Sequence, residues 1–363
     1  MSNIVISGYY GYSNAGDEAM LSAMIDVLTE FDPQAHITVI SGNPEDTKKR
    51  HGVDAVHRFH LPRISRALTK CDLLISGGGS LLQDVTSWRS LYYYLSIVTM
   101  AKTLGKPVML YAQGIGPLRG KNARRVMSII GNRVDVITVR DEGSRCELAE
   151  LGITRPHIEV TADPVLAIHP ANRNLGKTIL AKSGIDPYKP IVAFAVREWE
   201  TKNDYKKELA VTADRIIEEL GAQVLYLPMQ YPCDVEAAKR IRNKSRYKNA
   251  IFLEDEYTTT ELLSLVGNVD MLVGIRLHAL IFAGVMQVPM IGISYDPKID
   301  RFMETIGSEC VANLETVTSD VLMDSIRTKW EMRHRSDAKT QAAVSDLRRL
   351  AERNAVLALD FLR

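Results

Sequence analysis

The chain has 363 residues, which is long enough for about two domains, each with its own hydrophobic core. Its hydrophobic fraction of 46% and charged fraction of 25% are typical of a globular protein in water. The formal net charge of +1 argues against nucleic acid as the main partner, although a local basic patch could still contact a membrane surface.

The cysteines and the N-terminus indicate a cellular compartment. The four cysteines are scattered and form no CxxC pair, so the sequence predicts neither a disulfide framework nor a zinc site. The first residues lack the basic start and apolar core of a signal peptide. The longest apolar region contains Arg276 and His278, which a membrane span disfavours. We therefore expect a cytoplasmic protein with reduced thiols.

Short apolar runs alternate with helical patterns over residues 1–168. The first run, Asn3 to Ser7, is followed by glycines and by a helical pattern over residues 17–31. Further strands are expected at residues 36–40, 72–76, 107–112, 134–139 and 157–161. This alternation predicts a parallel, doubly wound α/β domain.

Residues 169–190 carry proline and glycine among polar residues and are expected to be the linker between domains. A second α/β domain is expected over residues 191–335, with a capping box at Thr258 and Glu261 opening one helix. Residues 336–363 predict a long helix that crosses back onto the first domain. Two Rossmann-like domains facing each other across a cleft is the architecture of the B-type glycosyltransferases.

Two glycine-rich loops of the first domain are candidates for binding a sugar acceptor. The loop Gly8-x-x-Gly11-x-x-Asn14-x-Gly16-Asp17-Glu18 matches neither the dinucleotide fingerprint nor a P-loop. Its two acids would repel a phosphate, so it is either a tight turn or a turn that binds a neutral sugar. Gly77, Gly78 and Gly79 end another expected strand, where they allow either close approach of a ligand or close packing.

Cationic or titratable side chains mark the ends of two expected strands in the second domain. Arg276 and His278 follow the strand at residues 271–274, and Lys298 follows the run at 288–293. Ligands bind at the carboxyl ends of parallel strands, so these residues predict a site for a small, multiply charged anion. The alternative is a buried arginine that pairs with a carboxylate and a histidine that bonds to backbone.

Two further arginines follow strands beside acidic neighbours. Arg140 lies next to Asp141, and Arg197 lies near Glu198 and Glu200, so an ordinary salt bridge competes with ligand binding in each case. None of the eight histidines occurs in an HxxxH or HExxH pattern, and no G-x-S-x-G elbow is present. We therefore expect neither a metal site nor a serine nucleophile.

Five motifs in order resemble the polysaccharide pyruvyl transferase family. These motifs are Gly11-Tyr12-Ser13-Asn14-Ala15-Gly16-Asp17-Glu18, Gly77-Gly78-Gly79, Gly114-Ile115-Gly116-Pro117, Val139-Arg140-Asp141 and Arg276-Leu277-His278-Ala279 with Lys298 downstream. Within the family, the chain is most similar to bacterial enzymes that add pyruvate to a secondary cell-wall polymer to which S-layer-type proteins anchor.

The resemblance implies phosphoenolpyruvate as the donor and a 4,6-linked pyruvate ketal on a sugar as the product. For the cell-wall subgroup it implies an N-acetylmannosamine acceptor in a lipid-linked precursor at the cytoplasmic face of the membrane. Phosphoenolpyruvate is a co-substrate, and no cofactor or metal is expected. Membrane contact is then expected to be peripheral, through the lipid-linked substrate.

The chemistry of the residues agrees with that reaction. A donor with a carboxylate and a phosphate requires a cluster of cations, and a protonated histidine can protonate the enol methylene. We assign His278 as the general acid, Arg276 and Lys298 as the main donor ligands, and Arg140 and Arg197 as secondary ones. Asp17 or Glu18 could be the base.

Two other functional classes fit parts of the sequence. A glycosyltransferase that uses a nucleotide sugar would share the architecture and would prefer a nucleoside diphosphate over phosphoenolpyruvate. A non-catalytic protein that binds a sugar polymer would not need the arginine, histidine and lysine cluster, because its ligand would be neutral.

Overall fold

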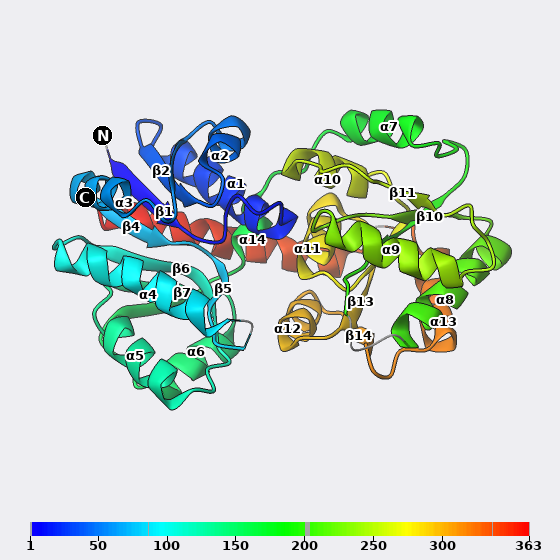
Figure 1. Cartoon of the computed structure of the whole chain (residues 1–363). Helices are drawn as coiled ribbons and strands as arrows, with labels where there is room; N and C mark the ends of the chain where they lie inside the picture. Colours follow the sequence, from blue (N-terminus) through cyan, green and yellow to red (C-terminus); the bar gives the residue numbers. More distant parts are fainter. Residues whose placement is uncertain (1, 86, 200–203, 336, 363) are drawn as a thin grey trace. The chain divides into compact units, whose positions relative to one another are not determined.

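The computed structural model describes residues 2–85, 87–199, 204–335 and 337–362. The chain divides into two compact units, which are described separately here. Unit 1 runs through Ile168 and resumes at Asp346, and unit 2 is His169–Ser345. Both units are parallel α/β structures, as the sequence predicts (Figure 1).

The sheet of unit 1 has eight strands, all paired in parallel. They are β1 (Asn3–Ser7), β2 (His36–Ser41), β3 (Asp54–His57), β4 (Leu73–Ser76), β5 (Gly79–Leu82), β6 (Val108–Ile115), β7 (Val136–Val139) and β8 (His157–Val160). Their order is β3-β2-β1-β4-β6-β7-β8, with β5 beside β6. The chain builds outward from β1 in one direction and then returns to build from β4 in the other. A sheet of this kind is doubly wound.

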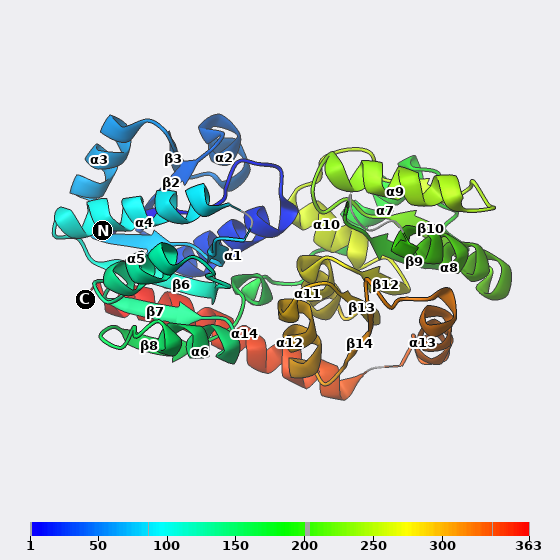
Figure 2. The same cartoon turned by 60° about the horizontal axis from the view of Figure 1, so that its bottom comes forward.

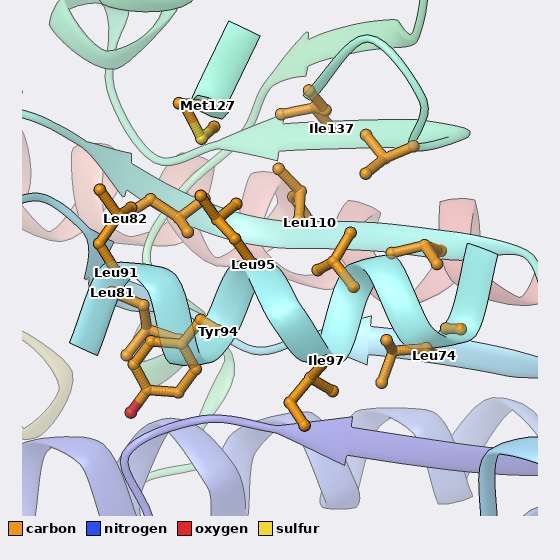
Figure 3. Packing of buried hydrophobic residues seen from close by; sticks show 14 of the residues in the cluster. Leu74, Leu81, Leu82, Leu91, Tyr94, Leu95, Ile97, Leu110, Met127 and Ile137 are labelled. Carbon is orange, nitrogen blue, oxygen red and sulfur yellow. The ribbon is translucent and has the colours of Figure 1, made fainter. Parts of the chain in front are cut away.

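The helices of unit 1 lie in the connections between these strands. They are α1 (Ala15–Phe31), α2 (Pro44–His51), α3 (Leu61–Lys70), α4 (Trp88–Thr103), α5 (Lys121–Gly131), α6 (Glu142–Glu150) and the short η1 (Pro164–Ala167). Helices α3 to α6 share one buried core with the sheet, to which α4 contributes Leu91 and Leu95 (Figure 3). Leu110 of β6 and Met127 of α5 complete the same layer. Burial of these apolar side chains stabilises this helical layer on the sheet.

Unit 2 has a parallel sheet of six strands in the order β11-β10-β9-β12-β13-β14. The strands are β9 (Ile191–Ala195), β10 (Gln223–Tyr226), β11 (Ile251–Phe252), β12 (Met271–Gly274), β13 (Met290–Ser294) and β14 (Cys310–Asn313). The helices are α7 (Arg173–Lys182), α8 (Asp204–Leu220), α9 (Cys233–Lys244), α10 (Thr259–Val266), α11 (Leu277–Met286), α12 (Pro297–Thr305) and α13 (Ser319–Glu331). The expected capping box is present at the start of α10, between Thr258 and Glu261.

Of two segments at the unit boundaries, one differs from the sequence prediction and the other agrees with it. Residues 169–190, which we expected to be a linker, contain α7, and this helix packs against α10 in unit 2. Gly176, one of the residues that suggested a linker, lies so close to α10 that an added Cβ would be 2.4 Å from the Ser264 carbonyl oxygen. The final helix, α14 (Ala338–Asp360), begins in unit 2 and ends in unit 1, as its predicted return requires (Figure 2).

Among the described residues, no helix combines the length and the apolar character needed to cross a bilayer.

Candidate functional site

The order of the strands identifies one position in each sheet where a ligand site is expected. Connections leave β9 and β12 in opposite directions across the sheet of unit 2, so a crevice opens between their carboxyl ends. These strands pair with Gly274 opposite Ala195. Arg276 and Arg197 each lie two residues beyond this pair, so they occupy equivalent positions past the carboxyl ends of the two strands. The structure thus brings together two arginines that are far apart in the sequence.

Arg276 is held by a buried carboxylate from α9. Its Nη2 lies 2.5 Å from Oδ1 of Asp234, and its Nε lies 3.1 Å from Oδ2. Nη2 also donates to the side-chain oxygen of Gln230 at 3.1 Å. Burial raises the pKa of the Asp234 carboxyl, and the ion pair with Arg276 opposes that rise. The alternative of a buried arginine paired with a carboxylate is therefore confirmed. Nη1 of Arg276 has no hydrogen bond to any described residue.

His278 lies in the first turn of α11, two residues after Arg276. Arg276 occupies the N-cap position of this helix, and its side chain makes no capping hydrogen bond. The neighbours of the histidine, Leu277 and Ala279, are buried, whereas His278 itself is only half-buried. An uncapped helix N-terminus favours anions, because backbone N–H groups and the helix dipole point toward them. His278 is therefore placed beside a position that suits a negatively charged ligand.

Tyr295, which follows β13, joins Arg197 to Lys298. Nη1 of Arg197 donates to the Tyr295 hydroxyl at 2.6 Å. The Arg197 guanidinium and the Lys298 ammonium lie 4.8 and 5.5 Å from the centre of the Tyr295 ring. Lys298 is also 3.3 Å from Asp296, the N-cap residue of α12. The cluster therefore presents two cations on one aromatic ring.

The salt bridge that competed with a ligand role for Arg197 does not form with Glu198. That carboxylate instead pairs with the buried Lys206 and lies 3.3 Å from Arg240. Glu200 lies outside the described residues. Arg197 therefore has no carboxylate partner in the part of the chain that the structure describes.

Arg140 belongs to unit 1, where it makes a buried ion pair. Its Nη1 donates to Asp163 at 3.0 Å and its Nη2 donates to the Ser80 hydroxyl at 3.0 Å. The neighbouring Asp141 is further away, at 4.0 Å from Nε. An ordinary salt bridge is thus present, but to a residue that the sequence did not suggest.

The glycine-rich loop of unit 1 is built largely by its own hydrogen bonds. The side chain of Asn14 caps α1 by accepting from the Gly16 amide at 3.1 Å. Glu18 is buried, with Oε1 accepting from the Gly11 amide at 2.8 Å and Oε2 lying 2.9 Å from Nε2 of His51. Glu18 therefore bonds to the turn through one oxygen and to the end of α2 through the other. Asp17, one residue earlier, is half-buried.

The turn at Gly77, Gly78 and Gly79 lies against the same loop, and side chains of the loop and of α1 pack closely on its backbone. A Cβ at Gly77 would be 2.1 Å from the hydroxyl of the buried Tyr10. A Cβ at Gly78 would be 3.3 Å from the sulfur of Met20. Gly79 has a φ of +92° and would place a Cβ 3.6 Å from Oδ1 of Asp17. Packing alone therefore explains these glycines, and Gly79 also lies near the loop acid.

Three residues of this region escaped the sequence analysis. Asp234 and Gln230, which hold Arg276, follow β10, and Tyr295 follows β13. All three lie beyond the carboxyl end of a strand, and polar residues at such positions are the signal that could have identified them. Among the described residues, no group of three or more His, Cys, Asp or Glu side chains is arranged to hold a metal ion.

Comparison with known sequences gives a family match and a curated relative. Residues 14–297 match the family model described as polysaccharide pyruvyl transferase. The amylovoran biosynthesis protein AmsJ of Erwinia amylovora is 22% identical over 88% of this chain and 89% of its own length. The family match begins at Asn14 and includes Arg276 and His278.

Solved structures with the same fold come from other enzyme classes. The UDP-GlcNAc 2-epimerase of Methanocaldococcus jannaschii is 14% identical, with a TM-score of 0.71 over 99% of this chain and 100% of its own. The S. aureus MnaA structure with UDP is 10% identical, with a TM-score of 0.67 over 99% of this chain and 96% of its own. The ADP-heptose lps heptosyltransferase II of E. coli is 14% identical, with a TM-score of 0.53 over 92% of this chain and 99% of its own. At these identities the likeness shows a shared glycosyltransferase-B-like fold.

Proposed function

This chain belongs to the polysaccharide pyruvyl transferase family, and from that premise we propose that its donor is phosphoenolpyruvate. The proposed acceptor is the 4,6-diol of a sugar, β-N-acetylmannosamine, in a lipid-linked precursor of a secondary cell-wall polymer. The products are a pyruvate ketal and phosphate. That the chain is a pyruvyltransferase of polysaccharide synthesis follows from the family itself and agrees with a relative named for amylovoran biosynthesis.

The observation that supports this donor is the set of side chains around the β9–β12 crevice. Arg197, Arg276 and Lys298 each follow one of three adjacent strands, and His278 starts the helix between two of them. Phosphoenolpyruvate carries a carboxylate and a phosphate, which guanidinium and ammonium groups recognise. Arg197 suits this role well, because it has no carboxylate partner among the described residues.

In the proposed reaction, His278 donates a proton to the enol methylene carbon, which leaves positive charge at C2. One sugar hydroxyl attacks C2 and loses its proton to a base. Lys298 and Arg276 stabilise the phosphate as it leaves with the C–O bond electrons. The second hydroxyl then closes the ketal and gives up its own proton. Arg140 and Arg197 are assigned as secondary donor ligands.

On the acceptor side we assign Asn14, Gly16, Asp17, Glu18, Gly78 and Gly79. Asp17 is the stronger candidate for the base, because it is half-buried, whereas Glu18 is buried and less accessible to a sugar. Asp17 also lies near Gly79, where the missing side chain would let a sugar approach the backbone.

The test is release of phosphate from phosphoenolpyruvate, measured with and without a lipid-linked N-acetylmannosaminyl disaccharide or a soluble mimic of it. We expect acceptor-dependent release together with an acid-labile pyruvate on the sugar, and no release by the His278→Ala variant. The proposal fails if the enzyme releases no phosphate with any such acceptor. Turnover of a nucleotide sugar in its place would favour the glycosyltransferase alternative.

A further inference from the structure

The charges of this chain are unevenly distributed along the sequence. Residues 55–134 contain 12 of the 45 Lys and Arg residues but only 2 of the 44 Asp and Glu residues. The rest of the chain therefore has 33 basic and 42 acidic residues. A net charge of +1 thus conceals a strongly basic segment inside an otherwise acidic protein, and such a segment creates a local positive potential.

The fold places this segment on one side of unit 1. Helices α3, α4 and α5 pack on the same core, and α4 contacts both of the others, so the three form a continuous layer (Figures 1 and 2). Each helix turns apolar residues inward, as Ile64 and Leu68 of α3 illustrate. The charged residues of these helices are therefore left on the outer surface of the layer.

Most cations of this layer are exposed and make no ion pair. Lys102 and Arg124 bond the carboxylates of Asp135 and Glu147. Seven others are exposed and have no ion-pair partner in the described ranges. We call these seven the basic face: Arg63, Arg66, Lys70, Arg89, Lys121, Arg125 and Arg133. Because no carboxylate among the described residues neutralises them, they are available to an external anion.

Large apolar side chains are exposed at one end of the basic face. Phe59 and Leu61, at the start of α3, are 69% and 57% exposed, and Trp88, the first residue of α4, is 61% exposed. Arg89 lies over the Trp88 ring at 5.5 Å. These residues follow β3 and β5, at the same edge of the sheet as the glycine-rich loops. Exposed aromatic and aliphatic residues beside cations are typical of surfaces that enter the lipid headgroup region.

We propose that the basic face and the apolar residues Phe59, Leu61 and Trp88 form a docking surface for an anionic phospholipid bilayer. The cations would neutralise lipid phosphates, while the three apolar side chains would enter the boundary between headgroups and acyl chains. A nucleic acid would use the cations but would leave Phe59 and Leu61 exposed to water. The proposal rests on the distribution of charge and apolar surface and holds for any donor or acceptor.

The first test measures co-sedimentation with vesicles in which roughly a third of the lipid is phosphatidylglycerol, against vesicles of phosphatidylcholine alone. We expect binding to the anionic vesicles only, weakened by high salt. The triple variant Arg63→Gln, Arg66→Gln, Lys70→Gln should bind roughly 100-fold more weakly, since each basic residue near an anionic surface contributes a factor of about five.

The matched control removes three exposed cations of unit 2. The variant Lys177→Gln, Lys182→Gln, Lys244→Gln loses as many positive charges as the triple variant of α3. It should nevertheless bind vesicles as the wild type does. Equal loss of binding in both triple variants would overturn the proposal, because it would make net charge alone responsible. Turnover of a soluble acceptor mimic should be unchanged in the α3 variant, so that failure of docking is distinguished from failure of the proposed reaction.

The second test addresses the apolar residues and the rival partner. Trp88→Ala should weaken vesicle binding at least threefold, whereas Tyr188→Ala in unit 2, where Tyr188 is 94% exposed, should have no effect. Binding that ignores Trp88 and is stronger for duplex DNA than for vesicles would reject the membrane and favour a nucleic acid.

Discussion

Arg276 and Asp234 form the most buried ion pair of the candidate site. The Asp234 side chain is fully buried and that of Arg276 is 13% exposed. Removing two charges from water is costly, and a second set of bonds offsets this cost: backbone amides of Met229 and Gln230 donate to the same carboxylate. The pair fixes the guanidinium at the end of β12 and leaves one nitrogen for a ligand.

Arg276→Ala is therefore expected to affect stability as well as donor binding. It leaves the Asp234 carboxylate buried without its partner, which costs about 3–5 kcal/mol. Loss of the arginine also removes the effect that opposes the raised pKa of Asp234. The folded variant then holds a proton that the unfolded chain has released, so its deficit should shrink as the pH falls from about 8 toward 5.

Urea unfolding of the wild type and the variant across this pH range measures that deficit. Arg145→Ala is a suitable control, because Arg145 and Glu142 form an exposed pair in unit 1, and it should cost less than about 0.5 kcal/mol at every pH. A deficit that grows as the pH falls would contradict the assignment of a buried, unpaired Asp234.

Replacing His278 and replacing Lys298 should affect different kinetic quantities. His278→Ala is expected to lower kcat by roughly 10²–10⁴-fold with little change in donor affinity, since a general acid acts in the transition state. Lys298→Ala should weaken binding of phosphoenolpyruvate, because it removes a charge that we propose contacts the donor in the ground state. Steady-state kinetics and direct titration of the donor distinguish the two. Normal turnover by the His278 variant would refute its role as the acid.

At the scale of elements, the sequence predicts where each strand lies in the chain better than it predicts which strands pair in the sheet. Apolar runs located β1, β4, β12 and β13 to within a few residues, because parallel strands buried on both faces are continuously apolar. The order of strands is set by long-range pairing, which leaves no local signal. For that reason the sequence placed Arg197 and Arg276 at strand ends, but only the sheet makes them neighbours.

The same limit explains why polar partners were missed. Asp234 lies in the first turn of α9, where an acid is usually explained by the helix dipole. Its burial depends on how α9 packs, which the local sequence does not encode. Gly176 shows the converse case, because a residue that commonly marks a loop is needed here for contact between helices.

Gly176→Ala should destabilise the packing of α7 on α10. The added methyl group would lie 2.4 Å from the Ser264 carbonyl oxygen, and backbone cannot rotate away as a flexible side chain can. The shift that this contact requires costs about 1–3 kcal/mol. Leu175→Ala, a change at the exposed neighbouring position, is the control and should be nearly neutral. Thermal unfolding compares them, and equal midpoints for the two variants would contradict the close packing.

At the scale of the whole molecule, α14 returns the chain to the unit in which it began. Beyond Asp346 the helix is bound to unit 1 by polar contacts: Arg348 donates to the carbonyl oxygen of Ile168 at 2.9 Å, and Arg353 pairs with Glu159 at 3.0 Å. Partial burial alone would raise the pKa of the Glu159 carboxyl, but the hydrogen bonds and charges of Arg353 and His157 together outweigh burial and lower it. Unit 1 is therefore discontinuous in sequence and is completed only when the last helix has docked.

Asn354 provides the test of this dependence. It is fully buried, accepts from the Thr161 hydroxyl at 2.8 Å, and donates to the Ala162 carbonyl oxygen at 3.3 Å. Asn354→Ala leaves buried polar groups on both residues without these bonds, which costs about 1–3 kcal/mol. Arg349→Ala is the control on the same helix, because Arg349 is exposed and forms a surface pair with Asp346, three residues earlier.

Hydrogen exchange read by mass spectrometry shows where this cost falls. If the two units unfold independently, Asn354→Ala should speed exchange in β7 and β8 of unit 1 and leave β9 and β12 of unit 2 unchanged. Equal acceleration in both sheets would instead mean that the chain unfolds as one cooperative body, with α14 as the element that couples the units. Either pattern measures how far the returning helix joins the two halves energetically, and the control variant should produce neither.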